Sequence, residues 1–259
     1  MNDTRDFRQE LYDQYFSTFR KFILDEDYFY KKAGYKAFRK QYLPVIKDFP
    51  MNSSILDIGC GTGIILEFLR DEGYQNLYGV DLSEQQINTA KEKGLNAEAI
   101  GIFEFIKKNS KKFDIIFAID LIEHFYKDEL IDLFMGINSL LNENGVLIIH
   151  TPNGDGIFPQ HIIYGDLTHL TIFNSNSLKQ ILYLTGFNNI NFYETRPIAK
   201  NLYGLIRLIL WKIVRAIFQS IRIIETGGAE KILSQDFITF AFKNNKKVEL
   251  NNNLSNSSE

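Results

Sequence analysis

The stretch that most constrains the fold is Leu56-Asp57-Ile58-Gly59-Cys60-Gly61-Thr62-Gly63, a short apolar run that opens into closely spaced glycines. Glycine tolerates backbone angles that a Cβ forbids, and it lets a ligand lie against the main chain. The pattern is typical of a strand that turns sharply into a helix, and at the carboxyl end of a parallel strand such a turn forms a nucleotide site. The sequence therefore predicts an α/β fold with a nucleotide site at this turn.

The residues around the turn indicate which nucleotide it would take. A dinucleotide fingerprint has the form G-x-G-x-x-G, whereas here Gly63 comes one residue early and Ile64 holds the sixth position. Asp57 repels phosphate at short range and suits a cation. Asp81 ends the next apolar run, about twenty residues further on, where a carboxylate can accept both ribose hydroxyls. S-adenosylmethionine (SAM) fits both acids, because it has no phosphate and carries a sulfonium and an ammonium.

From Asp57 to Gly63 and at Asp81 the chain resembles the class I SAM-dependent methyltransferases. The resemblance implies a Rossmann-like fold, in which a seven-stranded, mostly parallel sheet has helices on both faces, with N-terminal helices before it. Many relatives have a carboxylate after the third strand that binds the adenine amine, but this chain has Ile100-Gly101-Ile102-Phe103 there. Backbone groups are then expected to bind the adenine, and Ile102 and Phe103 either flank the ring or simply pack in the core. The residues expected to contact SAM are Asp57, Gly59, Cys60, Gly61, Thr62, Gly63, Asp81, Leu82, Ile102 and Phe103.

Apolar runs without polar alternation predict strands that are buried on both faces, and hence a parallel sheet covered by helices. These runs are residues 55–58, 77–80, 97–100, 113–119 and 146–150. Further strands are expected at 189–194 and 236–242, and the family fold implies that the last one is inserted antiparallel. Helices are expected over 7–49, 83–92, 127–141 and 175–184, with Ser83 and Gln86 as a capping box and with Tyr12 or Tyr15 as candidates to touch the cofactor.

The turn after the fourth expected strand, Asp120-Leu121-Ile122-Glu123-His124, is the candidate catalytic and metal site. If a helix begins at Asp120, the two carboxylates and the imidazole share one face, and acids this close call for a cation between them. The spacing resembles the metal-binding turn of the small-RNA 3′-terminal 2′-O-methyltransferases and of the quinone-precursor O-methyltransferases.

That resemblance implies a divalent metal such as Mg²⁺ or Mn²⁺ held by Asp120, Glu123, His124 and, from beyond the fifth strand, His169. The RNA enzymes have Glu where this chain has Asp120, so its shorter side chain binds through water or not at all. In the alternative without a metal, Glu123 and His124 cap the helix or contact the cofactor, and His124 or His169 is the general base. His150 is expected to be structural, His161 has no motif around it, and Asn153 is a candidate to orient an acceptor hydroxyl.

The composition limits the kinds of partner and compartment that are expected for this chain. The chain has 259 residues, of which 29 are Lys or Arg and 32 are Asp or Glu, so no overall basic field exists and no nucleic-acid partner is expected. Cys60 is the sole cysteine, which excludes an internal disulfide and fits a reducing compartment. The first residues lead into no apolar segment, so a cytoplasmic location is expected.

Residues 201–225 form an apolar stretch whose cations, Arg207, Lys212, Arg215 and Arg222, fall within one helical sector. The charges are too many for a bilayer-spanning helix. The stretch is interpreted as a helix on the inner membrane surface, a lid over the acceptor, a dimer face, or a helix packed on its own domain with a solvated basic stripe. The expected divisions are a helical cap over 1–50, a SAM-dependent methyltransferase domain over 51–243 with a helical insertion at about 198–232, and a disordered tail over 244–259.

The resulting hypothesis is an O-methyltransferase, in which an acceptor hydroxyl attacks the sulfonium methyl in line and the enzyme removes the hydroxyl proton. The segment from Thr151 to Phe173 and the insertion look similar to methyltransferases of bacterial capsule and lipopolysaccharide sugars. The first hypothesis for the acceptor is therefore a sugar hydroxyl, or a group attached to it such as a phosphate-linked group, on a glycan or small molecule in surface polysaccharide biosynthesis. Two alternatives stay open: a quinone, lipid-like or RNA-terminal acceptor, and a non-catalytic SAM-binding scaffold.

Overall fold

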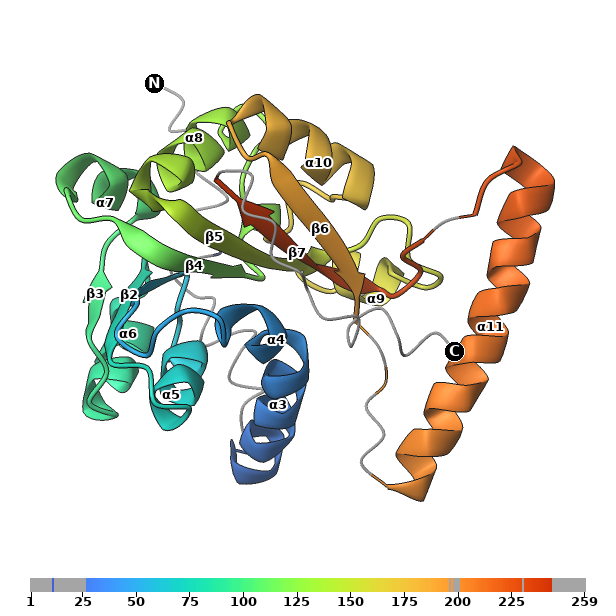
Figure 1. Ribbon diagram of the computed structural model, residues 1–259, viewed down its shortest axis with the longest axis horizontal. Coiled ribbons are helices and arrows are strands. Elements are labelled where there is room, and N and C mark those ends of the chain that lie inside the picture. Colours follow the sequence, from blue (N-terminus) through green and yellow to red (C-terminus); the bar gives the residue numbers. More distant parts are fainter. Residues whose placement is uncertain (1–10, 12–26, 196, 198–200, 230, 244–259) are drawn as a thin grey trace.

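The computed structural model describes residue 11 and residues 27–195, 197, 201–229 and 231–243. Figure 1 shows a central sheet between two layers of helices, with one long helix, α11 (Leu202–Thr226), standing beside them. Tyr12, Tyr15 and the expected tail over 244–259 lie outside the described residues. The expected division into cap, domain and tail therefore stays a prediction.

The sheet has seven strands in the order β3-β2-β1-β4-β5-β7-β6. Strands β1, β2, β3, β4 and β5 run parallel to their neighbours, whereas β7 pairs antiparallel with both β5 and β6. This topology confirms the expected fold, including the antiparallel last strand and the helical insertion before it. The strands are β1 (Ser54–Ile58), β2 (Asn76–Asp81), β3 (Ala97–Ala99), β4 (Phe113–Ile119), β5 (Leu141–Pro152), β6 (Asn189–Glu194) and β7 (Asp236–Phe242).

The central strands are apolar on both sides because helices cover both faces of the sheet. Ile115, Ile116 and Phe117 follow one another in β4, and all three are fully buried. Ile116 packs in the core on one face, while Ile115 and Phe117 pack in the core on the other. The absence of polar alternation in the sequence thus has the physical cause that was expected.

The helices divide between the two faces (Figure 1). One face carries α3 (Asp27–Gln41), α4 (Leu43–Ile46), α5 (Ile64–Asp71) and α6 (Glu84–Glu92), and the other carries α7 (Ile102–Lys108), α8 (Leu130–Leu140) and α10 (Ser175–Leu184). A short 3₁₀ helix, η2 (Ile122–His124), follows β4, and α9 (Gln160–Ile163) follows β5. No described helix is both long and apolar enough to cross a bilayer.

The expected capping box at Ser83 and Gln86 forms only in half. The Ser83 hydroxyl accepts the Gln86 backbone N–H at 3.4 Å, and so caps α6. The Ser83 N–H, however, donates to Asp81 Oδ1 at 2.8 Å instead of to the Gln86 side chain. The acid that ends β2 lies two residues away and outcompetes a neutral amide, since charged acceptors make the stronger hydrogen bonds.

Candidate active site

The glycine turn after β1 has the predicted strand–turn–helix form. Gly59, Gly61 and Gly63 have positive φ angles of 72°, 54° and 81°, which L side chains rarely adopt. At Gly63 a Cβ would also lie 2.3 Å from Leu95 Cδ1. The Gly59 N–H donates to the Val80 carbonyl at 2.8 Å, so the turn is fixed to the end of β2. The backbone of the turn is therefore held at the end of β2, with Gly59 and Thr62 partly exposed.

Two acids lie beside the turn, at the carboxyl ends of neighbouring strands. Asp81 Oδ2 accepts the Gly61 N–H at 2.9 Å, so this carboxylate is joined directly to the glycine turn. Asp57 is only 2% exposed, and burial, followed by the neighbouring charge of Asp81, raises its pKa well above the ordinary value. A buried carboxylate next to a second one is stabilised by a cation. The pair thus suits a positively charged ligand, as the sequence predicted.

Two of the expected cofactor residues have structural roles inside the turn. The Cys60 side chain packs under β2, where a Cβ at Gly79 would lie 2.7 Å from its sulfur. Burial raises the pKa of this thiol, so it is not a thiolate nucleophile. The carbonyl of Thr62 accepts the Lys93 ammonium at 3.0 Å, which ties the turn to the end of α6.

The residues expected to contact the adenine lie between the end of β2 and the start of α7. Leu82 is exposed, and a Cβ at Gly101 would come within 3.2 Å of its side chain. Ile102, at the start of α7, is buried, whereas Phe103 is half-buried and packs edge-on against Phe125 with ring centroids 5.8 Å apart. Leu82 and Gly101 therefore offer the open surface here, and Phe103 is at least partly engaged in core packing.

The turn after β4 differs from its prediction, because no helix begins at Asp120. Asp120 has a φ of 48° and is the one non-glycine residue with positive φ in the described chain. Its N–H still donates to the His150 carbonyl at 3.0 Å, as a continuation of the sheet, and the chain turns helical only at η2. A non-glycine residue in this conformation is strained, and such strain gathers at functional sites.

As a consequence Asp120 does not join the expected metal-ligand set. Its Oδ1 lies 2.6 Å from His150 Nδ1, and it is absent from the one candidate metal-ligand group among the described residues. That group contains the other three expected ligands, Glu123, His124 and His169, with one ligand atom from each within 4.8 Å of the others. The expectation that Asp120 shares a helix face with Glu123 and His124 is wrong.

Residues far apart in the sequence meet in this three-residue cluster because the loop after α9 packs on the β4 turn. The N–H groups of Leu170 and Thr171 donate to the Glu123 carbonyl at 2.8 and 3.0 Å. This brings His169 Nε2 to 4.0 Å from Glu123 Oε1, and the His124 and His169 rings lie 5.0 Å apart. The prediction that His169 comes from beyond the fifth strand to join Glu123 and His124 agrees with this arrangement.

Glu123 is the one carboxyl group of the cluster. It is 1% exposed, and its Oε2 accepts the Thr151 hydroxyl at 3.0 Å. Its Oε1 is buried without a hydrogen-bond partner among the described residues. Burial, followed by the charge of Asp120, raises the pKa of Glu123 to about 8. A buried oxygen left in this state favours a proton or a metal ion.

The two histidines are oriented in a way that suits a metal. Nδ1 of His124 lies 3.1 Å from the Thr168 carbonyl, and Nδ1 of His169 lies 3.3 Å from the Ile163 carbonyl. A proton on each Nδ1 leaves Nε2 with the lone pair that a metal requires. Burial and the neighbouring His169 lower the pKa of His124, which favours its neutral form. One carboxylate and two neutral imidazoles are a fitting donor set for a divalent cation.

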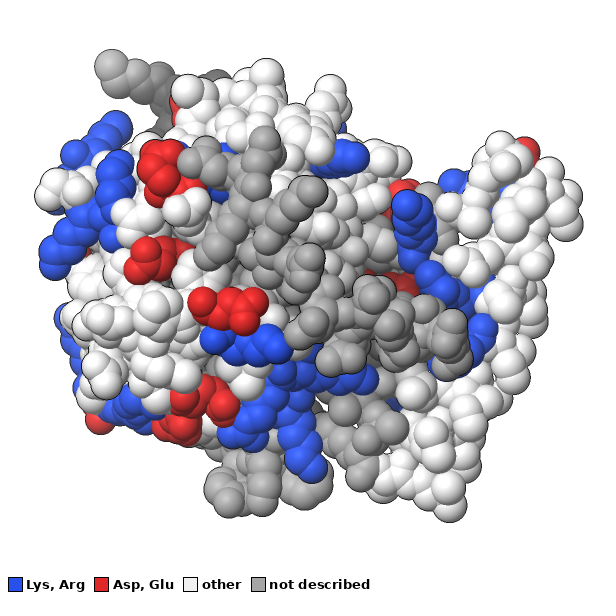
Figure 2. Space-filling model, viewed as in Figure 1, with Lys and Arg blue, Asp and Glu red and all other residues white. Residues whose placement is uncertain are grey.

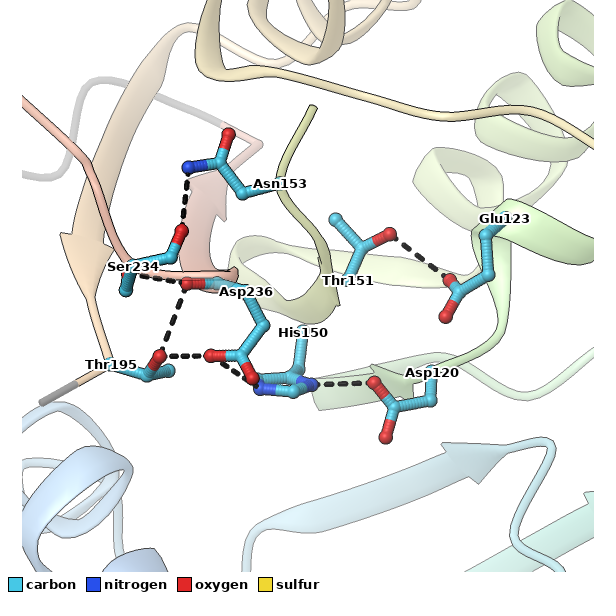
Figure 3. A network of polar contacts seen from close by, with 8 residues as sticks. All are labelled: Asp120, Glu123, His150, Thr151, Asn153, Thr195, Ser234 and Asp236. Carbon is cyan, nitrogen blue, oxygen red and sulfur yellow. Dashed lines mark hydrogen bonds and ion pairs between the residues drawn. The ribbon is translucent and has the colours of Figure 1, made fainter. Parts of the chain in front are cut away.

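Figure 3 shows a second polar group at this edge, centred on His150 at the end of β5. His150 Nδ1 contacts Asp120, and its Nε2 lies 3.6 Å from Asp236 Oδ1, while Asp236 also accepts the Thr195 hydroxyl. Burial lowers the pKa of His150, but Asp120 and Asp236 outweigh it and raise the pKa well above the ordinary value. The interpretation of His150 as a structural histidine agrees with this pairing.

The His150 pairing predicts a pH dependence of stability. Because its pKa is higher in the folded chain, His150 contributes its full stabilisation below about pH 6.5, and loses it as the pH rises through the folded pKa. Glu123, between about pH 4.5 and 8, and the buried Asp57 add slopes of the same sign, so the contribution of His150 must be separated by mutation. In urea unfolding above pH 6.5, we expect His150→Gln to reduce the fall in unfolding free energy by up to about 1.4 kcal/mol per pH unit. The exposed His161→Gln should keep the wild-type slope, and an unchanged slope in His150→Gln would contradict the pairing.

Asn153 does not have the role that was expected. It is buried, its Nδ2 donates to the carbonyls of Ile232 and Ser234 at 3.2 and 2.8 Å, and its Oδ1 accepts the Asp155 N–H at 3.0 Å. These hydrogen bonds occupy the Asn153 amide and join the loop after β5 to the segment before β7. The expectation that Asn153 orients an acceptor hydroxyl is therefore wrong.

The sequence analysis missed Thr151, which holds Glu123, and Asp236, which holds His150. For Thr151 the available signal was the alternation of side chains along β5, which places His150 and Thr151 on opposite faces of the sheet. Asp236 carried a weaker signal, as the first residue of an apolar run that had to pair with the end of β5.

The family described as a methyltransferase domain matches residues 27–191. The matched range contains the glycine turn, Asp57 and Asp81, and all three residues of the Glu123 cluster. The chain belongs to this methyltransferase domain family. The expectation of a methyltransferase is thereby confirmed at the level of the family. The edge described above is the carboxyl end of the parallel strands, where open α/β sheets in general bind their ligands.

Several curated relatives of this methyltransferase-domain chain carry the name ubiquinone biosynthesis O-methyltransferase. The protein from Histophilus somni is 30% identical over 125 residues, which cover 44% of this chain and 51% of the relative. The protein from Pelagibacter ubique is 34% identical over 122 residues, which cover 42% and 49%. The chain therefore matches about half the length of these relatives.

Solved methyltransferases share the fold over most of the chain. A SAM-dependent methyltransferase from Archaeoglobus fulgidus aligns with a TM-score of 0.63 at 23% identity, covering 84% of this chain and all of that one. Magnesium protoporphyrin IX methyltransferase from Synechocystis, solved with bound SAM, aligns with a TM-score of 0.58 at 13% identity, covering 94% of this chain and all of that one. At these identities the likeness concerns the fold.

Proposed function

We propose that the chain is a SAM-dependent O-methyltransferase. The observation that carries the proposal is the pair of acids at the glycine turn, with Asp57 buried and Asp81 bonded to the Gly61 N–H. Burial and the charge of Asp81 destabilise the ionised Asp57, and the donor's positive charges would offset both effects. Asp81 has the position from which a carboxylate accepts ribose hydroxyls. SAM, when bound here, supplies the methyl group.

The Glu123 cluster is the proposed site of acceptor activation. It lies at the same edge of the sheet, and its Glu123 carboxylate and two imidazoles are the groups able to take a hydroxyl proton or hold a divalent cation. A cation would be held by Glu123, His124 and His169, and it would supply Lewis acidity that lowers the pKa of an acceptor hydroxyl. Thr151 and the carbonyls of Thr168 and Ile163 keep these side chains oriented.

For the acceptor we favour a hydroxyl on a quinone precursor or a similar lipid-like molecule. Two observations support this choice: the names of the relatives, and three exposed apolar side chains on the segment that leads to His169, namely Phe158, Tyr164 and Leu167. The sugar hydroxyl, which was the first hypothesis, has no support in the relatives and structures described above. It stays an untested expectation, as do the RNA-terminal acceptor and the non-catalytic scaffold.

The test is release of S-adenosylhomocysteine by the full chain with SAM and Mg²⁺ or Mn²⁺. We expect turnover with a catechol that bears a prenyl chain and little with a nucleotide-activated hexose. Turnover with the hexose alone would refute the lipid-like acceptor but keep the O-methyl transfer. SAM binding without turnover on either acceptor would point to the scaffold.

A further inference from the structure

Helix α11 exposes a continuous apolar stripe along its length. Ile213 and Ile217, near its middle, are 53% and 55% exposed, and similar exposure recurs from the first turn to the last. The exposed apolar residues are Leu202, Tyr203, Leu205, Ile206, Ile209, Leu210, Ile213, Ile217, Ile221, Ile223 and Ile224. Ser220, which is also exposed, returns its hydroxyl to the Ala216 carbonyl at 2.9 Å. In the part of the chain that the structure describes, this is the longest exposed run of aliphatic side chains.

The opposite side of α11 faces the rest of the molecule. Arg215 donates to Glu194 Oε1 at 3.2 Å and to the Lys231 carbonyl at 2.8 Å, and Phe218 packs edge-on against Phe158 with centroids 6.1 Å apart. These contacts attach the helix near its middle to the end of β6 and to the loop after β5. Figure 1 shows α11 beside the domain, and these contacts fix which side of the helix faces it. The exposed apolar side chains lie on the other side of the helix and point away from the domain.

The width of the apolar stripe distinguishes between two surfaces that could cover it, a single partner helix and a flat apolar surface. At 100° per residue the exposed apolar positions span roughly 160° of the helix circumference, whereas a pair of helices in contact needs only a narrow seam. The helix is also long, at 25 residues or roughly 37 Å. A broad and mostly aliphatic face suits a flat apolar surface better than a single partner helix.

The charges of α11 indicate which kind of flat apolar surface the helix contacts. Within Leu202–Thr226 there are four cations and one acid, although the whole chain has a net charge of −3. Arg207 and Lys212 lie just outside the two borders of the apolar stripe, and both are exposed. In Figure 2 the outer side of the helix is white apart from a red acidic group at its upper end, and Lys and Arg lie on the side nearer the domain. Long basic side chains at the borders of an apolar face reach anionic headgroups when the helix lies flat.

We propose that α11 docks on an anionic lipid surface. The apolar stripe enters the boundary between headgroups and acyl chains, and Arg207 and Lys212 contact the headgroup phosphates at its two borders. Phe158 joins the docked helix to the loop after β5, so the segment that leads from Phe158 to His169 is held close to the lipid. The inference goes beyond the proposed methyl transfer, and it fits an acceptor that resides in the membrane.

Sedimentation of the full chain with vesicles tests the proposal without SAM or acceptor, so its outcome is separate from that of the proposed function. We expect binding to vesicles of phosphatidylglycerol and phosphatidylcholine, and much weaker binding to phosphatidylcholine alone. The double variant Ile213→Glu, Ile217→Glu should lower the partition coefficient at least about a hundredfold. Arg207→Gln with Lys212→Gln should lower it roughly 25-fold and weaken its salt dependence.

The matched control is Ile131→Glu with Met135→Glu, which places the same two charges four residues apart on the exposed side of α8, and it should bind like the wild type. Circular dichroism confirms that each variant is folded. Failure of the wild type to bind anionic vesicles would overturn the proposal. So would a stable dimer in analytical ultracentrifugation that the Ile213 and Ile217 variant converts to a monomer, since the stripe would then be covered by a second copy.

Discussion

Glu123→Gln is expected to lower methyl transfer by roughly 10²- to 10⁴-fold and to leave SAM affinity unchanged. The substitution keeps the size of the side chain and its hydrogen bond from Thr151, but it removes the carboxylate whose Oε1 is buried without a partner. The glycine turn and Asp81 are untouched, so donor binding has no reason to change. Steady-state turnover and calorimetric titration with SAM give the two quantities.

Histidine variants supply the matched comparison for this prediction. His169→Ala should lose activity as Glu123→Gln does, because His169 lies 4.0 Å from Glu123. His161→Ala, an exposed histidine on the neighbouring α9, should retain it. Thermal unfolding with added Mn²⁺ provides a readout besides activity: we expect Mn²⁺ to stabilise the wild type and neither the Glu123→Gln nor the His169→Ala variant. Full turnover of Glu123→Gln in the presence of a chelator would exclude the cluster from the chemistry.

Asp81→Ala is expected to weaken SAM binding by at least about a hundredfold. The carboxylate is the proposed acceptor for the ribose hydroxyls, and each hydrogen bond to a charged group contributes roughly 1.5–3 kcal/mol. It also accepts the N–H groups of Gly61 and Ser83, so its loss loosens the glycine turn itself. Calorimetric titration of the variant with SAM measures the effect.

Asp114→Ala is the control for a loss of affinity caused by general destabilisation. Asp114, near the start of β4, accepts the Ser54 N–H at 2.8 Å and the Asn142 amide at 2.7 Å, so its carboxylate does similar structural work. It lies at the opposite end of the strands from the glycine turn, since Ser54 begins β1. Equal losses of SAM affinity in both variants would show that Asp81 acts through stability alone.

The sequence was sufficient for the sheet and for the positions of the glycine turn and its two acids. Runs such as Phe113–Ile119 are strands because helices bury both of their faces, and that pattern is local and readable. The glycine turn and the two acids are likewise local: each follows its strand directly, and parallel strands end at one edge. His169 could be assigned only through a family resemblance, because its contact with Glu123 depends on how two loops pack.

The Asp120 turn shows where such reasoning fails. The i, i+3, i+4 spacing is meaningful only if a helix begins at once, and here one more sheet hydrogen bond at Asp120 and its positive φ delay the turn. The Asp120 carboxylate then contacts His150, and no sequence pattern predicted this pairing. For α11 the sequence predicted an amphipathic helix, but only the contacts of Arg215 and Phe218 reveal which side faces outward.

The most direct test of the account is a calorimetric titration of the full chain with SAM, S-adenosylhomocysteine and NAD⁺. We expect each chain to bind one molecule of SAM or, in a separate titration, one molecule of S-adenosylhomocysteine. We expect no heat of binding with NAD⁺. Absence of SAM binding, or binding of NAD⁺ that Asp81→Ala abolishes, would contradict the assignment of this edge to a cationic methyl donor.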